Sequence, residues 1–129
     1  MAIRTLPMLY RYAADVVSVY DGDTITVDIQ LGFGITLNKQ KVRLAGVDTP
    51  ELRGADKVRG KEVRDWVRAQ ILNKRIIIVT SKDKKGKYGR WLGEVFFTDS
   101  AVITASTAVE SLRNLNTELV ERGMAVRWT

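Results

Sequence analysis

Two short acidic segments of the chain carry more carboxylates than their turns require. The first is "DGDT", residues 21–24, whose Asp-Gly pair is typical of a tight type I′ hairpin turn, because both residues tolerate positive φ angles. Such a turn has no need of Asp23, which begins a strand otherwise rich in Thr, Ile and Val. Asp23 is therefore a candidate for a chemical role.

The second acidic segment is "VDTPE", residues 47–51, at the end of another apolar run. One interpretation is local, since Pro50 bars continuation of a strand and Asp48 can cap the loop that follows. The other is that Asp23 and Asp48 lie at adjacent ends of neighbouring strands and, with Glu51, form an oxygen-rich cluster suited to Ca²⁺ or Mg²⁺. Zinc is not expected, because the chain contains no His and no Cys.

Arg43 lies inside the strand that leads to Asp48. A charge at such a position is costly unless it reaches a partner or a cavity. Two interpretations stay open, a structural ion pair or a planar guanidinium that binds a phosphate beside the metal.

A basic segment, "TSKDKKGKYGRW", spans residues 80–91. By itself it is typical of a solvated hairpin loop. A second interpretation is that Tyr88 stacks on a base or ribose, because it stands among five cations: Lys82, Lys84, Lys85, Lys87 and Arg90.

The elements that must position these residues are predicted from hydrophobic periodicity. Alternation of period two at 15–20, 24–31 and 41–47, and continuous apolar runs at 75–80 and 91–97, predict five strands. Helical spacing within residues 60–74 predicts one helix between the third and fourth strands, with an apolar stripe of Val63, Trp66, Val67 and Ile71. Its opposite face, with Lys57, Lys61, Arg64 and Arg68, is either solvated or a track for nucleic acid.

A second helix is predicted from about residue 115 to 122, with Asn114 as N-cap and Gly123 just past its end. The order of strands and helices is that of an α+β protein with a five-stranded OB-fold β-barrel and two to three helices. Residues 99–111 are small and β-branched without a clear period, and no element is assigned to them.

Composition bounds the class of protein. The 129 residues fit one domain, 1–129, that buries its own core, and a formal charge of +6 with a pI near 9.8 favours a polyanionic partner. No segment has the length and apolar character of a membrane span, so no membrane partner is expected. We expect a monomer, cytoplasmic as the sequence stands, or secreted if an export signal has been removed.

Three motifs together resemble a known family. "DGDT" at 21–24, "VRLAGVDTPE" at 42–51 and "KYGR" at 87–90 resemble, in order, the active-site segments of the staphylococcal nuclease (thermonuclease) family. The resemblance covers roughly residues 14–127. It implies that Asp23, Asp48 and the backbone carbonyl of Thr49 bind one Ca²⁺ ion.

The same resemblance gives roles to the remaining polar residues. Glu51 would orient or activate the attacking water, while Arg43 and Arg90 would bind the scissile phosphate. Lys87 and Tyr88 match positions of the nucleotide pocket, and Lys84 and Lys85 of the same loop join them as candidates for substrate binding.

The implied activity is calcium-dependent hydrolysis of DNA and RNA, with a preference for single strands because a paired base must first be freed. The alternative is a non-catalytic OB-fold module that binds nucleic acid while the site is idle. The presence of all the site residues favours catalysis. The chain departs from the family pattern in a longer connection over residues 28–40 and an apparent insertion at 99–111.

Overall fold

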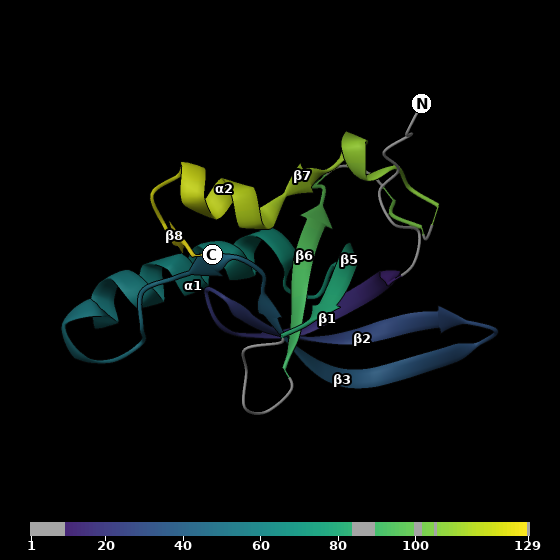
Figure 1. The fold of residues 1–129 in the computed structure, drawn as a ribbon, viewed down its shortest axis with the longest axis horizontal. Helices are drawn as coiled ribbons and strands as arrows, with labels where there is room; N and C mark the ends of the chain where they lie inside the picture. The colour runs from purple at the N-terminus through teal and green to yellow at the C-terminus, as the bar shows by residue number, and fades with distance from the viewer. Residues whose placement is uncertain (1–9, 84–89, 100–101, 105, 129) are drawn as a thin grey trace.

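The computed structural model describes residues 10–83, 90–99, 102–104 and 106–128. Its main feature is a barrel of five strands: β1 (Arg11–Asp21), β2 (Thr24–Gly32), β3 (Ile35–Leu44), β5 (Arg75–Lys82) and β6 (Trp91–Phe97). Antiparallel pairs run in the order β3-β2-β1-β5-β6, and a parallel pairing between β3 and β6 closes the ring (Figure 1). The predicted five-stranded barrel is confirmed.

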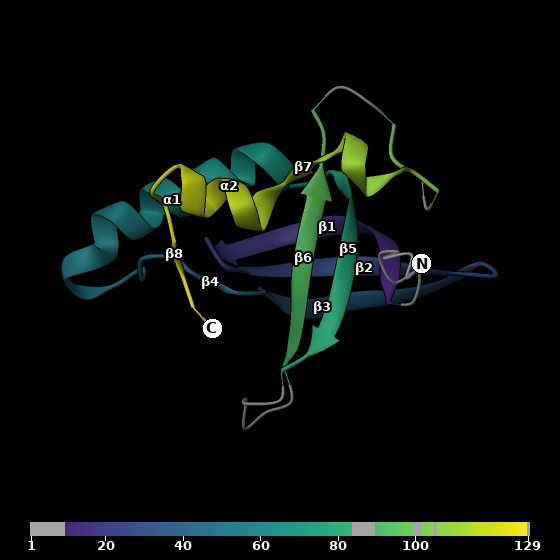
Figure 2. The same cartoon turned by 45° about the horizontal axis from the view of Figure 1, so that its top comes forward.

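Two α-helices, α1 (Lys57–Ile71) and α2 (Leu115–Glu121), lie along the same side of the barrel in both views (Figures 1 and 2). The helix α1 connects the β3–β4 segment to β5, which is the predicted position. The remaining elements are short: β4 (Val47–Asp48), β7 (Arg113–Asn114), β8 (Val126–Arg127), and the 3₁₀ turns η1 (Gly54–Asp56) and η2 (Val109–Ser111). No helix within the described ranges is long and apolar enough to cross a membrane.

The helix α1 buries the predicted apolar stripe, with Val63, Val67 and Ile71 inaccessible to solvent and Trp66 packed at the edge of the core. Gly60 lies on the same face, and a Cβ there would come within 2.2 Å of the Glu51 carbonyl oxygen. Only glycine therefore lets α1 approach the loop after β4 this closely. On the opposite face Arg68 donates to the Val19 carbonyl at 2.9 Å, so this cation holds the helix to β1.

The helix α2 begins and ends as its sequence predicts. The Asn114 side chain accepts a hydrogen bond from the Thr117 amide at 3.1 Å, which is an N-cap. Gly123 follows the helix with φ of +71°, the left-handed conformation of a C′ glycine.

The hairpin between β1 and β2 differs from its prediction. Asp21 pairs with Thr24, so the central turn residues are Gly22 and Asp23, and neither has the positive φ that a type I′ turn requires. The type I′ prediction is wrong. Glycine is needed here for space, because a Cβ on Gly22 would lie 2.7 Å from Val63 Cγ1 and 2.8 Å from Thr49 Oγ1.

Part of the unassigned segment 99–111 forms a second, smaller core. Ile103 and Val109 are buried there against Ala13, Ile77 and Phe96, on strands β1, β5 and β6. The main core fills the barrel and the space beneath the two helices. Since the apolar residues of this segment follow no clear period, the sequence could not indicate that Ile103 and Val109 are the buried ones.

Candidate active site

Three of the predicted site residues meet where β2 begins and where β3 and β4 end. Asp23 is only 8% exposed, and its Oδ2 accepts hydrogen bonds from the Thr49 amide at 3.0 Å and from Arg43 Nη2 at 3.4 Å. The same Arg43 nitrogen makes an ion pair with Asp48 Oδ1. Arg43 therefore bridges the two carboxylates, and the structural ion pair considered for it is present.

The backbone fixes this arrangement. Thr24 and Arg43 are cross-strand partners, and the Leu44 amide donates to the Asp23 carbonyl at 2.8 Å. The pairing of β4 with β8 brings the end of the chain to the site, where the Trp128 ring centroid lies 5.5 Å from Arg43 Cζ. The Arg43 guanidinium is thus confined by two carboxylates and one aromatic ring.

Arg90 reaches the same site from the start of β6. It makes an ion pair with the buried Asp83 at 3.2 Å, and both line a cavity of about 300 Å³ together with Arg43, Asp48 and Trp128. The structure therefore brings the two predicted phosphate-binding arginines to one cavity. Asp83 was missed by the sequence analysis, because it is a single acid in a basic segment and has no periodic signal.

Asp21 is a second acidic residue that the sequence analysis assigned only to the turn. Its Oδ1 accepts a hydrogen bond from the Asp23 amide at 3.1 Å. Burial, followed by a side-chain hydrogen bond to Asp23 and the like charge of that carboxylate, raises the pKa of Asp21 to about 6, although the bond from the Asp23 amide lowers it. The signal was available in "DGDT", where a second carboxylate stands two residues before Asp23.

Glu51 does not join this group. Glu51 is 71% exposed at its side chain and lies 3.7 Å from Arg53 Nε. Among the described residues no three acidic side chains are placed to hold a metal ion, so the predicted cluster of Asp23, Asp48 and Glu51 is not formed. The four loop residues Lys84, Lys85, Lys87 and Tyr88 lie outside the described residues.

The donor chemistry nonetheless fits a hard cation. Asp23 and Asp48 direct one oxygen each toward the same positive group, the Arg43 guanidinium. The Thr49 hydroxyl beside them is buried without a hydrogen-bond partner. Paired carboxylates and further oxygen atoms are the ligands that Ca²⁺ and Mg²⁺ prefer.

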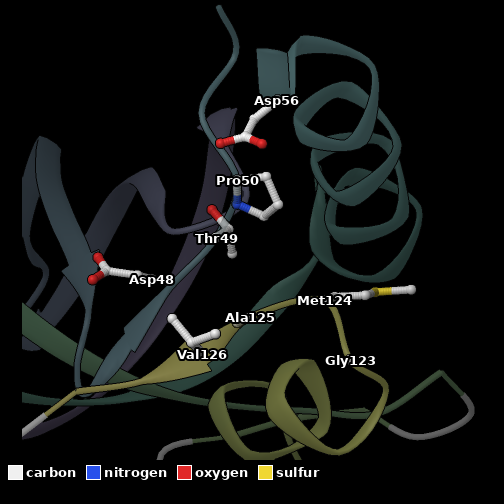
Figure 3. Close-up of a pocket in the computed structure, with 8 residues that line it drawn as sticks. All are labelled: Asp48, Thr49, Pro50, Asp56, Gly123, Met124, Ala125 and Val126. Carbon is white, nitrogen blue, oxygen red and sulfur yellow. The ribbon is translucent and has the colours of Figure 1, made fainter. Parts of the chain in front are cut away.

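A second cavity, of about 280 Å³, lies on the other side of Asp48 (Figure 3). It is formed by Asp48, Thr49, Pro50, Asp56 and residues 123–126. Figure 3 shows the carboxylates of Asp48 and Asp56 pointing in different directions, so they do not converge on one ion. Asp48 therefore separates this cavity from the one that contains both arginines.

The fold and the site define a small OB-type barrel with carboxylates and guanidiniums gathered at the end of β3. A family model described as Staphylococcal nuclease homologue matches residues 41–129, which include all the predicted site residues except Asp23. The chain belongs to this family, so the family resemblance stated from the sequence is confirmed.

Individual relatives agree with this family. The chain is 35% identical over 92 residues to a thermonuclease of Staphylococcus hyicus, covering 65% of the chain and 51% of the relative. It is 31% identical over 125 residues to a micrococcal nuclease of Shigella flexneri, covering 95% and 62%. An uncharacterized protein of Methanocaldococcus jannaschii is 32% identical over 136 residues, covering 89% and 58%. The chain spans between half and about three-fifths of the length of these relatives.

Proposed function

We propose that this chain is a calcium-dependent nuclease that hydrolyses phosphodiester bonds of DNA and RNA. The observation that carries the proposal is that Arg43 and Arg90 line one cavity, with Arg43 held between Asp23 and Asp48. Relatives named thermonuclease and micrococcal nuclease support the same reaction class.

The two arginines bind and polarise the scissile phosphate. Attack on phosphorus builds negative charge on its non-bridging oxygens, and a guanidinium fork contacts two such oxygens at once. Because that charge is greatest in the transition state, the arginines stabilise the transition state more than the bound substrate. The ion pairs with Asp23 and Asp83 hold both side chains in place before substrate arrives.

Water supplies the nucleophile. Its oxygen forms a bond to phosphorus while the bond from phosphorus to one ester oxygen breaks, and the displaced oxygen takes up a proton. Glu51 is the residue we assign to orient this water or accept its proton, from an exposed position on the loop after β4. From the family resemblance we expect products with a 3′-phosphate.

Asp23, Asp48 and the Thr49 carbonyl are the groups that would hold Ca²⁺. When bound there, the ion would supply positive charge next to the phosphate. Without it, the net negative charge of the two carboxylates and Arg43 would oppose the charge that builds on the phosphate in the transition state, which is why we propose that cleavage depends on the metal.

Single strands are the preferred substrates in this proposal. A cavity of about 300 Å³ accepts part of one strand, and a paired base must be unstacked at a cost of a few kcal/mol to enter it. The basic loop residues Lys84, Lys85, Lys87 and Tyr88 are proposed to contact the same strand.

The test is incubation with matched single-stranded DNA, RNA and GC-rich duplex, each with Ca²⁺ or with a chelator. We expect calcium-dependent cleavage of all three, fastest on the single strands. One observation favours the alternative of a non-catalytic binding module, because Arg43 pairs with both carboxylates and Glu51 stands apart from them. Binding of the oligonucleotides without cleavage at any Ca²⁺ concentration would establish that alternative.

A further inference from the structure

A groove that contains neither Asp48 nor Asp83 also adjoins the two arginines. It has a volume of about 310 Å³ and is lined by Tyr20, Thr24, Lys41, Arg43, Arg90 and Trp91. Arg43 and Arg90 line this groove and also the cavity with Asp48, so the two spaces meet at the guanidiniums. A phosphate held by the arginines would therefore have one space on each side of it.

The strands place the groove residues on one outer surface of the barrel. Thr24 pairs with Arg43 across β2 and β3, and Lys41 lies two residues before Arg43, so both cations project from the same face. Tyr20 stands at a break in the β1–β2 register between Val19 and Asp21, where β1 has one extra residue. Such a bulge redirects a side chain, and bulges are common next to functional sites.

The charge of the groove differs from that of the neighbouring cavity. Three cations, Lys41, Arg43 and Arg90, line it, and the described residues that line it include no acidic side chain. The neighbouring cavity contains Asp48 and Asp83. The groove is thus suited to the phosphodiester backbone, while the carboxylates lie on the other side of the arginines.

Two aromatic side chains are exposed in the groove. Tyr20 is 68% exposed and Trp91 is 45% exposed. Lys82 Nζ lies 4.4 Å from the centroid of the Trp91 ring, so a cation–π contact holds that ring in position. Exposed aromatic rings beside a row of cations are the arrangement with which OB folds stack single-stranded bases.

We infer that this groove, defined by Tyr20, Lys41 and Trp91, binds the nucleotide adjoining the scissile phosphate on the side away from Asp48. The inference rests on the proposed function, since it assumes that the scissile phosphate binds at Arg43 and Arg90. The occupant is one nucleotide of a single strand, its base on Tyr20 or Trp91 and its phosphate at Lys41. The sequence of the base matters little, because stacking accepts every base.

The experiment measures binding without turnover. A fluorescein-labelled oligodeoxythymidylate of about ten nucleotides, within the site size of one OB fold, is titrated by anisotropy in chelator against the chain and its variants. Loss of one stacked base weakens binding roughly 5- to 150-fold, so we expect Trp91→Ala and Tyr20→Ala to raise Kd within this range. Trp91→Phe should restore most of the affinity. Phe33→Ala, which removes a fully exposed ring outside the groove, is the matched control and should leave Kd unchanged.

Salt dependence separates stacking from charge. Lys41→Gln should reduce the slope of log K against log salt by about one, whereas Trp91→Ala should leave that slope unchanged. Circular dichroism and melting curves check that each variant is folded. If Trp91→Ala does not fold, Tyr20→Ala and Trp91→Phe still test the groove.

Two results would overturn the inference. One is an unchanged Kd for folded Tyr20→Ala and Trp91→Ala. The other is a dimer of the wild-type chain that Trp91→Ala dissociates without loss of oligonucleotide affinity, which would assign the groove to a second copy. Absence of cleavage by the wild type would reject the proposed function. The comparison of Kd between the wild type and its variants would still test the groove.

Discussion

The antiparallel pair of strands β2 and β3, called the β2–β3 ribbon below, has one polar, buried end and one apolar, exposed end. At the barrel end, Asp23 and Arg43 are held by bonds to Thr49 and Asp48 from outside the ribbon. At the far end the ribbon extends beyond the barrel (Figure 1), and its large apolar side chains are exposed: Leu31, Phe33, Ile35 and Leu37. The ribbon therefore has buried polar side chains at its barrel end and exposed apolar side chains at its far end.

The difference teaches what fixes a strand pair in position. At the barrel end β1, β4 and β6 lie against the ribbon, so Asp23 and Arg43 find partners from other elements. At the tip no described element covers the ribbon, and Gly32, Phe33 and Gly34 all take positive φ values in a tight connection. Chemistry is expected where neighbours impose geometry, and variation is tolerated where they do not.

The largest expected effect is that of Asp23→Asn at the barrel end. The amide oxygen can still accept from the Thr49 amide, but the charge that faces Arg43 is lost. We expect calcium-dependent cleavage to fall by at least about a hundredfold, comparable to removing one transition-state contact, with the melting temperature little changed. Initial rates on single-stranded DNA at saturating Ca²⁺ measure this. Asp65→Asn, an exposed acid on α1, is the matched control and should keep the wild-type rate.

The next effect is on stability, at Asn116 of α2. Its buried side chain accepts from the Val95 amide at 3.0 Å and donates to the carbonyls of Ala45 and Gly93, so it joins α2 to the strands around the site. Asn116→Ala leaves these backbone groups unpaired and should lower the free energy of unfolding by about 2–3 kcal/mol. Urea unfolding measures it. Asn38→Ala on the exposed ribbon should change the free energy of unfolding by less than about 0.5 kcal/mol. Equal losses in the two variants would contradict the contrast between the site and the exposed ribbon.

A smaller effect is expected from pH. The hydrogen bonds from Arg113, which lie at 2.7 Å, lower the pKa of Glu118 below its usual 4.5 in the folded chain. A lowered folded pKa stabilises the native state above the unfolded value, and this contribution disappears as pH falls through the folded value. The free energy of unfolding should therefore decline below about pH 4.5, and solvent screening keeps the loss within about 1 kcal/mol. In Glu118→Gln this decline should be weaker, and an identical pH profile would contradict the assignment.

The smallest effect is expected at the ribbon tip. Phe33→Ser removes a fully exposed ring, so the free energy of unfolding should change by no more than about 0.5 kcal/mol. The cleavage rate should also be unchanged. A melting temperature several degrees lower would mean that the tip is covered in solution, and the contrast between the two ends would have to be redrawn.

Local signals in the sequence predicted most of the fold. The ends of α2 follow from Asn114 and Gly123, because capping depends on residues next to each other in the chain. The apolar stripe on α1 was also predicted, because helical spacing is a pattern of residues close together in the chain. The turn at Gly22 was predicted wrongly, since the need for glycine arises from Val63 and Thr49, which are distant in sequence. Packing between elements therefore determines that position 22 is glycine, and no local sequence pattern indicates such packing.

The grouping of the candidate site residues was predicted in part. The sequence singled out Asp23, Arg43, Asp48 and Arg90, which the structure brings together, but it could not indicate that Arg43 would bridge both carboxylates. Asp21 and Asp83 were missed because each has a local explanation in the sequence, as a turn residue or as one acid in a basic loop. The burial of Asp83 and the partial burial of Asp21 depend on how the strands meet, which only the structure provides.

The central claim is that Arg43 acts on the phosphate in addition to pairing with Asp23 and Asp48. The most direct test is the cleavage rate per folded molecule of Arg43→Lys, with Ca²⁺ affinity measured by calorimetry on the same preparation. Lysine keeps the charge and loses the planar fork, so we predict a rate lower by about two to three orders of magnitude, with Ca²⁺ affinity and folding nearly unchanged. A strongly lowered melting temperature with an undiminished rate per folded molecule would contradict the claim and leave Arg43 a structural ion pair.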